Sequence, residues 1–157
     1  MSRRNPLPWP RLRAYEACDR DACARIFVIA QQAAFPWEPT GTVTEAGFDR
    51  SIRGEELWVA EVAMPASNPG PQRWQVAGLI SVFMPSQFVH SLFVDPAFHG
   101  LGLGSALLDR ALYATGGRAS LKCDERNRKG CSFYERRGWR ASEWGWDPDG
   151  AWIRFSR

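Results

Sequence analysis

A glycine-rich segment, HGLGLGS over residues 99–105, most tightly constrains what this chain can fold into. It follows QFVHSLFV (87–94), whose β-branched and aromatic residues predict a strand, and it leads into a helical pattern from about Gly102 to Thr115. Glycine allows close backbone approach, and a helix N-terminus presents free N–H groups with a partial positive charge. The segment therefore predicts a strand–loop–helix unit that binds phosphate oxygens, although an ordinary strand-to-helix turn is the alternative.

Two common phosphate-binding motifs do not fit this loop. Reading G-x-G-x-x-G/A from Gly100 places Ser105 at the last position, and reading it from Gly102 places Leu107 there. A Walker A loop is excluded because no Gly-Lys-Ser/Thr follows. The loop also lies beyond the midpoint of the 157 residues, whereas a Rossmann domain usually opens with its glycine loop.

The hydrophobic patterning predicts one α/β (α+β) domain over residues 1–157, with 1–10 as an extended N-terminal arm. Strands are expected over 11–17, 56–63, 73–84, 87–94 and 118–123, with a closing hairpin from 139–146 and 151–157. Helices are expected over about 19–34, 43–53, 102–115 and 127–137, the first with Asp19 and Asp21 as N-cap and first-turn carboxylates. The order β-α-α-β-β-β-α-β-α-β-β predicts a mixed sheet of six to seven strands with about four helices.

Composition excludes several classes of protein. A hydrophobic fraction of 45% with 24% charged residues argues against a disordered or fibrous chain. No apolar run approaches the ~18–20 residues of a membrane span, and the basic N-terminus is not followed by the apolar region of a signal peptide. The cysteines have spacings that match no zinc pattern, so we expect reduced thiols, no metal and a cytoplasmic location; they are Cys18, Cys23, Cys123 and Cys131.

The net charge of +3 is mild, and most basic residues are scattered. One cluster stands out: Arg126, Arg128, Lys129, Arg136 and Arg137. A nucleic-acid-binding protein would normally carry a broader basic stripe, so we expect no nucleic-acid partner. The nucleic-acid-binding alternative rests on this cluster alone, and an anionic cofactor would explain the same residues.

Two motifs resemble those of the GCN5-related N-acetyltransferases. LFVDPAFHGLGLGSALL (92–108) is similar to the family's acetyl-CoA signature, in which Val-x-Pro is followed by [Arg/Gln]-x-x-G-x-[G/A] opening a helix. NRKGCSFYERRGW (127–139) resembles the second signature, an Asn before a Phe-Tyr-Glu-x-x-Gly-aromatic run. Residues 1–86 match by element pattern only. His99 stands where the family usually has Arg or Gln but can still present a ring N–H, and Gly130 stands where Ala is common.

The resemblance implies an acetyl-CoA co-substrate and no metal. The fourth and fifth strands would splay apart, so that the fourth strand pairs with the pantetheine arm while the glycine loop holds the pyrophosphate. Asn127 would hydrogen-bond the pantetheine, although a role as helix N-cap is the alternative and both can coexist. The implied cofactor-binding residues are Leu92, Phe93, Val94, His99, Gly100, Leu101, Gly102, Leu103, Gly104, Ser105 and Asn127.

Tyr134 would be the general acid by its place in the second motif. Acyl transfer to an amine expels a thiolate whose thiol has a pKa of ~8.5, and a phenol with a pKa of ~10 can donate a proton or a hydrogen bond to that thiolate. The alternative is a core aromatic beside Phe133. We expect Phe133 to face the core and Tyr134, ~100° around the helix, to face the cofactor.

The general base is open. Some relatives use a Glu on the fifth strand, but Lys122 occupies that position here and cannot act as a carboxylate base. His90, or a water held by it, is the better candidate, although such a histidine is often only a satisfied core residue. Alternation along the strand predicts that Phe88, His90, Leu92 and Val94 share one face, opposite Val89, Ser91 and Phe93.

The resulting hypothesis is direct acetyl transfer to a primary amine in a ternary complex, without a covalent intermediate. Phe35, Trp37 and Glu38 would shape the acceptor pocket, as the resemblance implies. The acceptor, a small-molecule or peptide amine, is left open, and the C-terminal hairpin offers an edge for a homodimer. The alternative is a non-catalytic CoA-binding module that regulates a partner. None of the cysteines lies in a nucleophile motif, and Cys131 alone merits attention.

Overall fold

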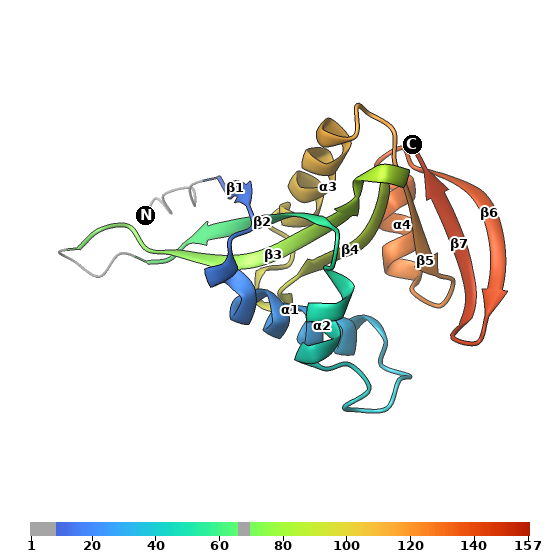
Figure 1. Cartoon of the computed structure of the whole chain (residues 1–157), viewed down its shortest axis with the longest axis horizontal. Coiled ribbons are helices and arrows are strands. Elements are labelled where there is room, and N and C mark those ends of the chain that lie inside the picture. The colour runs from blue at the N-terminus through green and yellow to red at the C-terminus, as the bar shows by residue number, and fades with distance from the viewer. Residues whose placement is uncertain (1–8, 66–69) are drawn as a thin grey trace, which may run out of the picture.

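The structure is a computed structural model that describes residues 9–65 and 70–157. Its sheet has seven strands in the order β1-β2-β3-β4-β5-β7-β6 (Figure 1). The strands are β1 (Arg11–Ala14), β2 (Glu56–Ala63), β3 (Trp74–Phe83), β4 (Phe88–Val94), β5 (Ser120–Asp124), β6 (Arg140–Asp147) and β7 (Gly150–Ser156). The helices are α1 (Arg20–Ala34), α2 (Glu45–Ser51), α3 (Leu103–Ala114) and α4 (Arg128–Arg136). The predicted element order is confirmed; the predicted arm over 1–10 lies outside the described residues except for its last two.

The sheet consists of two antiparallel halves that meet at β4 and β5. These two strands pair in parallel, and the pairing is limited to Phe88 with Ser120 and Val89 with Leu121. Beyond these pairs β4 continues to Val94 and β5 to Asp124, so the strands part toward their C-terminal ends (Figure 1). The predicted splay is therefore present, and it leaves one edge of β4 without a neighbouring strand.

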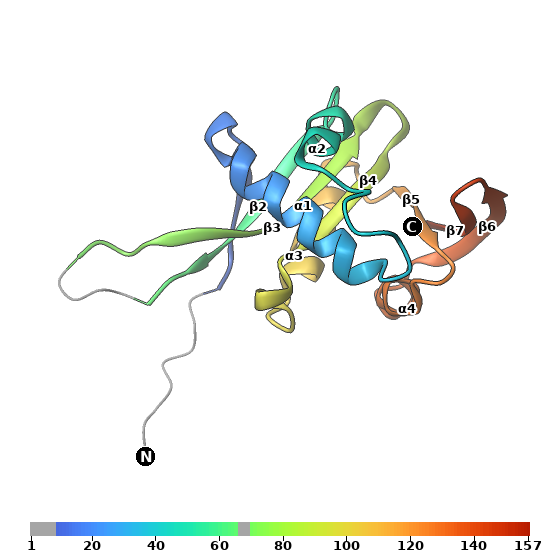
Figure 2. The same ribbon diagram turned by 90° about the horizontal axis from the view of Figure 1, so that it is seen from below.

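Each face of the sheet carries its own hydrophobic core. Helices α3 and α4 cover one face, where Leu103, Leu107 and Leu108 pack against Ile80 and Val82. Helices α1 and α2 cover the other, with α1 crossing the sheet in Figure 2; there the fully buried side chains include Ile26, Phe48 and Leu79. Burial of each of these large apolar side chains stabilises the folded state by about 1.5–3 kcal/mol relative to leaving it exposed to water. Within the described ranges, no helix is both long and apolar enough to cross a membrane.

Strand β4 contains a β-bulge at His90. The β3–β4 register passes from Ser81 paired with Ser91 to Val82 paired with Val89, so His90 has no partner on β3. A bulge inserts one extra residue and reverses the alternation of side chains beyond it. The bulge therefore decides which residues of β4 face the core under α3.

The predicted alternation along β4 is wrong for this reason. Val89 lies in the core under α3, on the same side as Leu92 and Val94. The rings of His90 and Phe88 contact each other outside that core, with centroids 4.6 Å apart. His90 and Phe88 thus share a face, as predicted, but they do not share it with Leu92 and Val94.

The first helix also starts differently from the prediction. Asp19 occupies the N-cap position of α1, but its carboxylate does not cap the helix. Instead it accepts two hydrogen bonds from the Arg13 guanidinium, at 2.7 and 2.8 Å, and one from the backbone N–H of Glu16. The Arg13 hydrogen bonds lower the pKa of Asp19, so the pair stays ionised at neutral pH.

The C-terminal hairpin places β6 at one edge of the sheet. Trp144 and Trp146 on this strand are exposed, at 65% and 75% of their surface. The homodimer expected through this hairpin stays a prediction.

Candidate active site

The glycine loop presents a row of free donors. Within the described residues, no backbone N–H from Gly100 to Ser105 donates a hydrogen bond, and the first to do so is Ala106, to the carbonyl of Gly102. Gly100 and Gly102 both have left-handed backbones, with φ of 80° and 78°, which turn the chain into the helix at little steric cost. Free N–H groups at the positive end of a helix dipole form a site for phosphate oxygens.

Gly104 has a different role, which is to let α4 approach α3. A Cβ there would lie 3.3 Å from Cζ of Phe133. The Arg137 guanidinium lies over the Phe133 ring, 3.7 Å from its centroid, and its Nε donates to Oγ of Ser105 at 2.6 Å. These contacts hold the start of α3 against the last turn of α4.

His99 does not offer its ring N–H as expected. Its Nε2 lies 3.3 Å from the carbonyl oxygen of Val94. A neutral imidazole has one N–H, and in this tautomer that group donates to the protein, leaving Nδ1 as an acceptor. Only the protonated ring would present an N–H to a bound anion as well.

Asn127 is the N-cap of α4, which confirms that alternative. Its Oδ1 accepts from the backbone N–H of Gly130 at 3.0 Å, while its Nδ2 makes no hydrogen bond in the part of the chain that the structure describes. A Cβ on residue 130 would lie 2.6 Å from this Nδ2. Gly130 therefore makes room for the amide, and Nδ2 stays free to bind a ligand.

Tyr134 has a packed ring and an unpaired hydroxyl. The ring contacts aromatic neighbours at centroid distances of 5.3 Å to Phe133, 5.7 Å to Phe155 and 6.1 Å to Trp139. Both Phe133 and Tyr134 pack on the α3–α4 core, so the predicted division of faces between them is not seen. Among the described residues the Tyr134 hydroxyl has no hydrogen-bond partner. Burial raises its pKa above the ordinary value near 10, so the hydroxyl keeps its proton at neutral pH.

Two cysteines lie beside Tyr134. Sγ of Cys123 on β5 is 3.5 Å from Sγ of Cys131 on α4. Burial raises the pKa of both thiols, so neither is a thiolate at neutral pH. This argues against Cys131 as a nucleophile.

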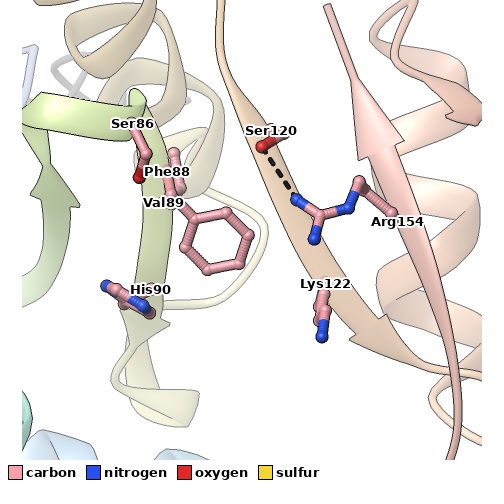
Figure 3. A pocket seen from close by; sticks show the side chains of 7 residues that line it. All are labelled: Ser86, Phe88, Val89, His90, Ser120, Lys122 and Arg154. Carbon is pink, nitrogen blue, oxygen red and sulfur yellow. Dashed lines mark hydrogen bonds between the residues drawn. The ribbon is translucent and has the colours of Figure 1, made fainter. Parts of the chain in front are cut away.

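A pocket of about 580 Å³ opens where β4 and β5 begin to part, on the side of the sheet away from α3 (Figure 3). Its lining is drawn from β4, β5, β7 and the turn before β4: Ser86, Phe88, Val89, His90, Ser120, Lys122 and Arg154. Glu55, which directly precedes β2, contacts His90. Its carboxylate Oε1 is 2.7 Å from Nδ1 of His90. Sequence reasoning missed Glu55, because nothing in the local pattern links it to a residue 35 positions away.

Glu55 fixes the orientation of the His90 ring. Its side chain is only 4% exposed, whereas that of His90 is 47% exposed. With a proton on Nδ1 the ring donates to Glu55, and Nε2 has no partner among the residues described. Oε2 of Glu55 is buried without a hydrogen bond. The arrangement suits a group that accepts a proton at Nε2.

The residues predicted to shape the acceptor pocket lie elsewhere. Phe35 and Trp37 stack edge to face at 5.5 Å, and Trp37 lies under the Arg126 guanidinium at 4.5 Å. Arg126 also pairs with Asp124 at the end of β5. Phe35, Trp37 and Glu38 do not line the pocket beside His90, and their role in an acceptor pocket stays a prediction.

In the comparisons with known proteins, the family model and several similar solved structures are described as acetyltransferases. A family model described as an acetyltransferase (GNAT) domain matches residues 53–141, more than half of the chain. No curated protein matches this chain in a sequence search. Among solved structures, it is similar to a GCN5-related N-acetyltransferase from Rhodopseudomonas palustris, described also as a class-II aminotransferase. Identity there is 18%, the TM-score is 0.72, and the match covers 98% of both chains.

Two further solved structures share the fold. The PaiA N-acetyltransferase of Thermoplasma acidophilum, in complex with coenzyme A, is 12% identical with a TM-score of 0.70 over 92% of this chain and 97% of that one. The ribosomal-protein-S18-alanine N-acetyltransferase of Escherichia coli is 18% identical with a TM-score of 0.64, over 94% of this chain and 92% of that one.

Proposed function

Because the chain belongs to the GNAT acetyltransferase family, we propose that it transfers acetyl from acetyl-CoA directly to a primary amine in a ternary complex. The observation that carries this proposal is the parting of β4 and β5 after a single short stretch of pairing. The gap has free phosphate-binding donors at one end and the His90 pocket on the face away from α3. Acetyl-CoA and the acceptor amine would therefore enter this gap from opposite sides and meet there.

The donor-binding role rests on three sets of groups. The free edge of β4 over Leu92, Phe93 and Val94 offers backbone groups to the pantetheine amides. The N–H groups of Gly100 to Ser105 offer donors to the pyrophosphate. Asn127 adds its free Nδ2 beside the pantetheine. The coenzyme A bound to the structurally similar PaiA enzyme supports the same donor here.

In the chemical step, the amine nitrogen forms a bond to the acetyl carbonyl carbon while the carbon–sulfur bond breaks. Nε2 of His90 accepts the proton that the amine loses, directly or through a water, and Glu55 stabilises the resulting imidazolium. The hydroxyl of Tyr134 protonates the leaving thiolate and regains its proton from solvent. Burial raises the pKa of Tyr134, so the hydroxyl is protonated at neutral pH and available as a proton or hydrogen-bond donor.

Thiol release from acetyl-CoA across a panel of amines tests the proposal. The panel should contain polyamines, aminoglycosides, amino acids and peptides with free N-termini or lysines. The assay is best run on a Cys18→Ser background, because Cys18 is exposed and would react with the thiol reagent. Acetylated product with at least one amine, confirmed by mass, is the expected result. A protein that binds CoA but acetylates no amine would instead be the regulatory module that the sequence left as an alternative.

A further inference from the structure

The side chains that line the pocket beside His90 carry more positive than negative charge. Two of its seven lining side chains are cationic, Lys122 and Arg154, and none is acidic. The Lys122 ammonium lies 3.8 Å from the centroid of the Trp152 ring, and within the described residues it forms no ion pair. The ring fixes the ammonium in place without neutralising it. Lys122 is therefore an available cation at this pocket.

Arg154 is held in place by hydrogen bonds from only part of its guanidinium group. Its Nε donates to Glu143 at 2.9 Å, and Nη1 donates to Oγ of Ser120 at 3.3 Å (Figure 3). The guanidinium lies 5.5 Å from the centroid of the Phe88 ring on β4. Nη2 has no partner among the described residues. Glu143 offsets the charge of Arg154, and the carboxylate of Glu55 is buried behind His90, so the excess positive charge of the lining side chains comes from Lys122.

We propose that the acceptor is a small amine that also carries a carboxylate, as an amino acid does. The carboxylate would bind Lys122 Nζ and Arg154 Nη2, and the amine would then lie toward Nε2 of His90. A charge-assisted contact of this kind is among the stronger hydrogen bonds in proteins. A polyamine or a lysine side chain would instead bring a second cation toward Lys122. The pocket volume of about 580 Å³ fits a small molecule.

This inference rests on the proposed acetyl transfer, and matched acceptors test it. The assay compares each amino acid of a panel with its amide, which keeps the amine and side chain but removes the carboxylate. We expect kcat/KM to favour the free acid of the best acceptor by about tenfold or more. Lys122→Gln should reduce this preference at least tenfold, mainly through KM, and Arg154→Gln provides a second variant. Arg73→Gln, which removes an exposed charge just before β3, should keep the preference.

A binding measurement separates failure of this inference from failure of the proposed function. With CoA present, calorimetry compares N-acetyl amino acids with their amides, and needs no turnover. Tighter binding of the acids, lost in Lys122→Gln, supports the inference even if no amine is acetylated, a result that would overturn only the proposed function. Amides that bind and react as well as acids, or an unchanged preference in both pocket variants, overturn the inference and leave acetyl transfer standing.

Discussion

Replacing Tyr134 by phenylalanine removes one oxygen atom from the proposed acid and nothing else. The ring contacts with Phe133, Trp139 and Phe155 are those of a phenyl group and should be kept. The hydroxyl makes no hydrogen bond in the described residues, so the variant loses none of the ~0.5–1.5 kcal/mol that such a bond contributes. We therefore expect the free energy of unfolding to change by less than about 0.5 kcal/mol.

The effect on the chemical step should be much larger. Without the hydroxyl the leaving group departs as an unprotonated thiolate, and loss of a general acid typically lowers kcat by ~10²-fold, or about 2.7 kcal/mol. Burial raises the pKa of Tyr134 above its ordinary value near 10, so the wild-type donor keeps its proton throughout the neutral and mildly basic range. The factor lost should accordingly be the same at pH 7 and at pH 9.

Three measurements test whether Tyr134 is the general acid: kcat by thiol release, CoA affinity by calorimetry, and the thermal unfolding midpoint. Tyr113→Phe is the matched control, because Tyr113 is 83% exposed on the neighbouring helix α3. Only kcat should fall in Tyr134→Phe, and nothing should change in the control. Full kcat in Tyr134→Phe would refute the acid assignment and leave Tyr134 as a core aromatic. A parallel fall in CoA affinity and unfolding midpoint would show a structural role instead.

Other predictions concern the donor loop, the base and the thiols. Gly102→Asp should weaken CoA binding at least tenfold relative to Gly102→Asn; both residues tolerate the left-handed backbone at φ 78°, and only Asp adds a negative charge. Equal calorimetric affinities would contradict the pyrophosphate assignment. His90→Ala should lower kcat by ~10²-fold, whereas Glu55→Gln, which keeps a hydrogen-bond acceptor for the ring, should lower kcat only about tenfold. An unchanged kcat in His90→Ala would point to an amine deprotonated in solvent. One of the four cysteines, the exposed Cys18, should react rapidly with a thiol reagent at pH 8, and all four should react after unfolding; rapid reaction of Cys23, whose pKa burial raises to about 12, would contradict the described packing.

The sequence alone determined the order of strands and helices and the position of the glycine loop. These features depend on residues that lie close together along the chain. Periodicity separates strands from helices, and Gly100 and Gly102 mark a turn whose backbone other residues adopt at a cost. The spacing from Asn127 to Tyr134 likewise lies within one helix. The resemblance to a known family rested on the same local runs.

Only the tertiary structure decided which side chains meet in the gap. The bulge at His90 depends on the register between β3 and β4, which alternation along one strand does not reveal. Glu55 reaches His90 from 35 residues away, and Lys122 and Arg154 become neighbours only because β7 inserts between β5 and β6. Strand pairing between distant segments is set by the packing of the whole sheet, so no local pattern could place these charges beside one another.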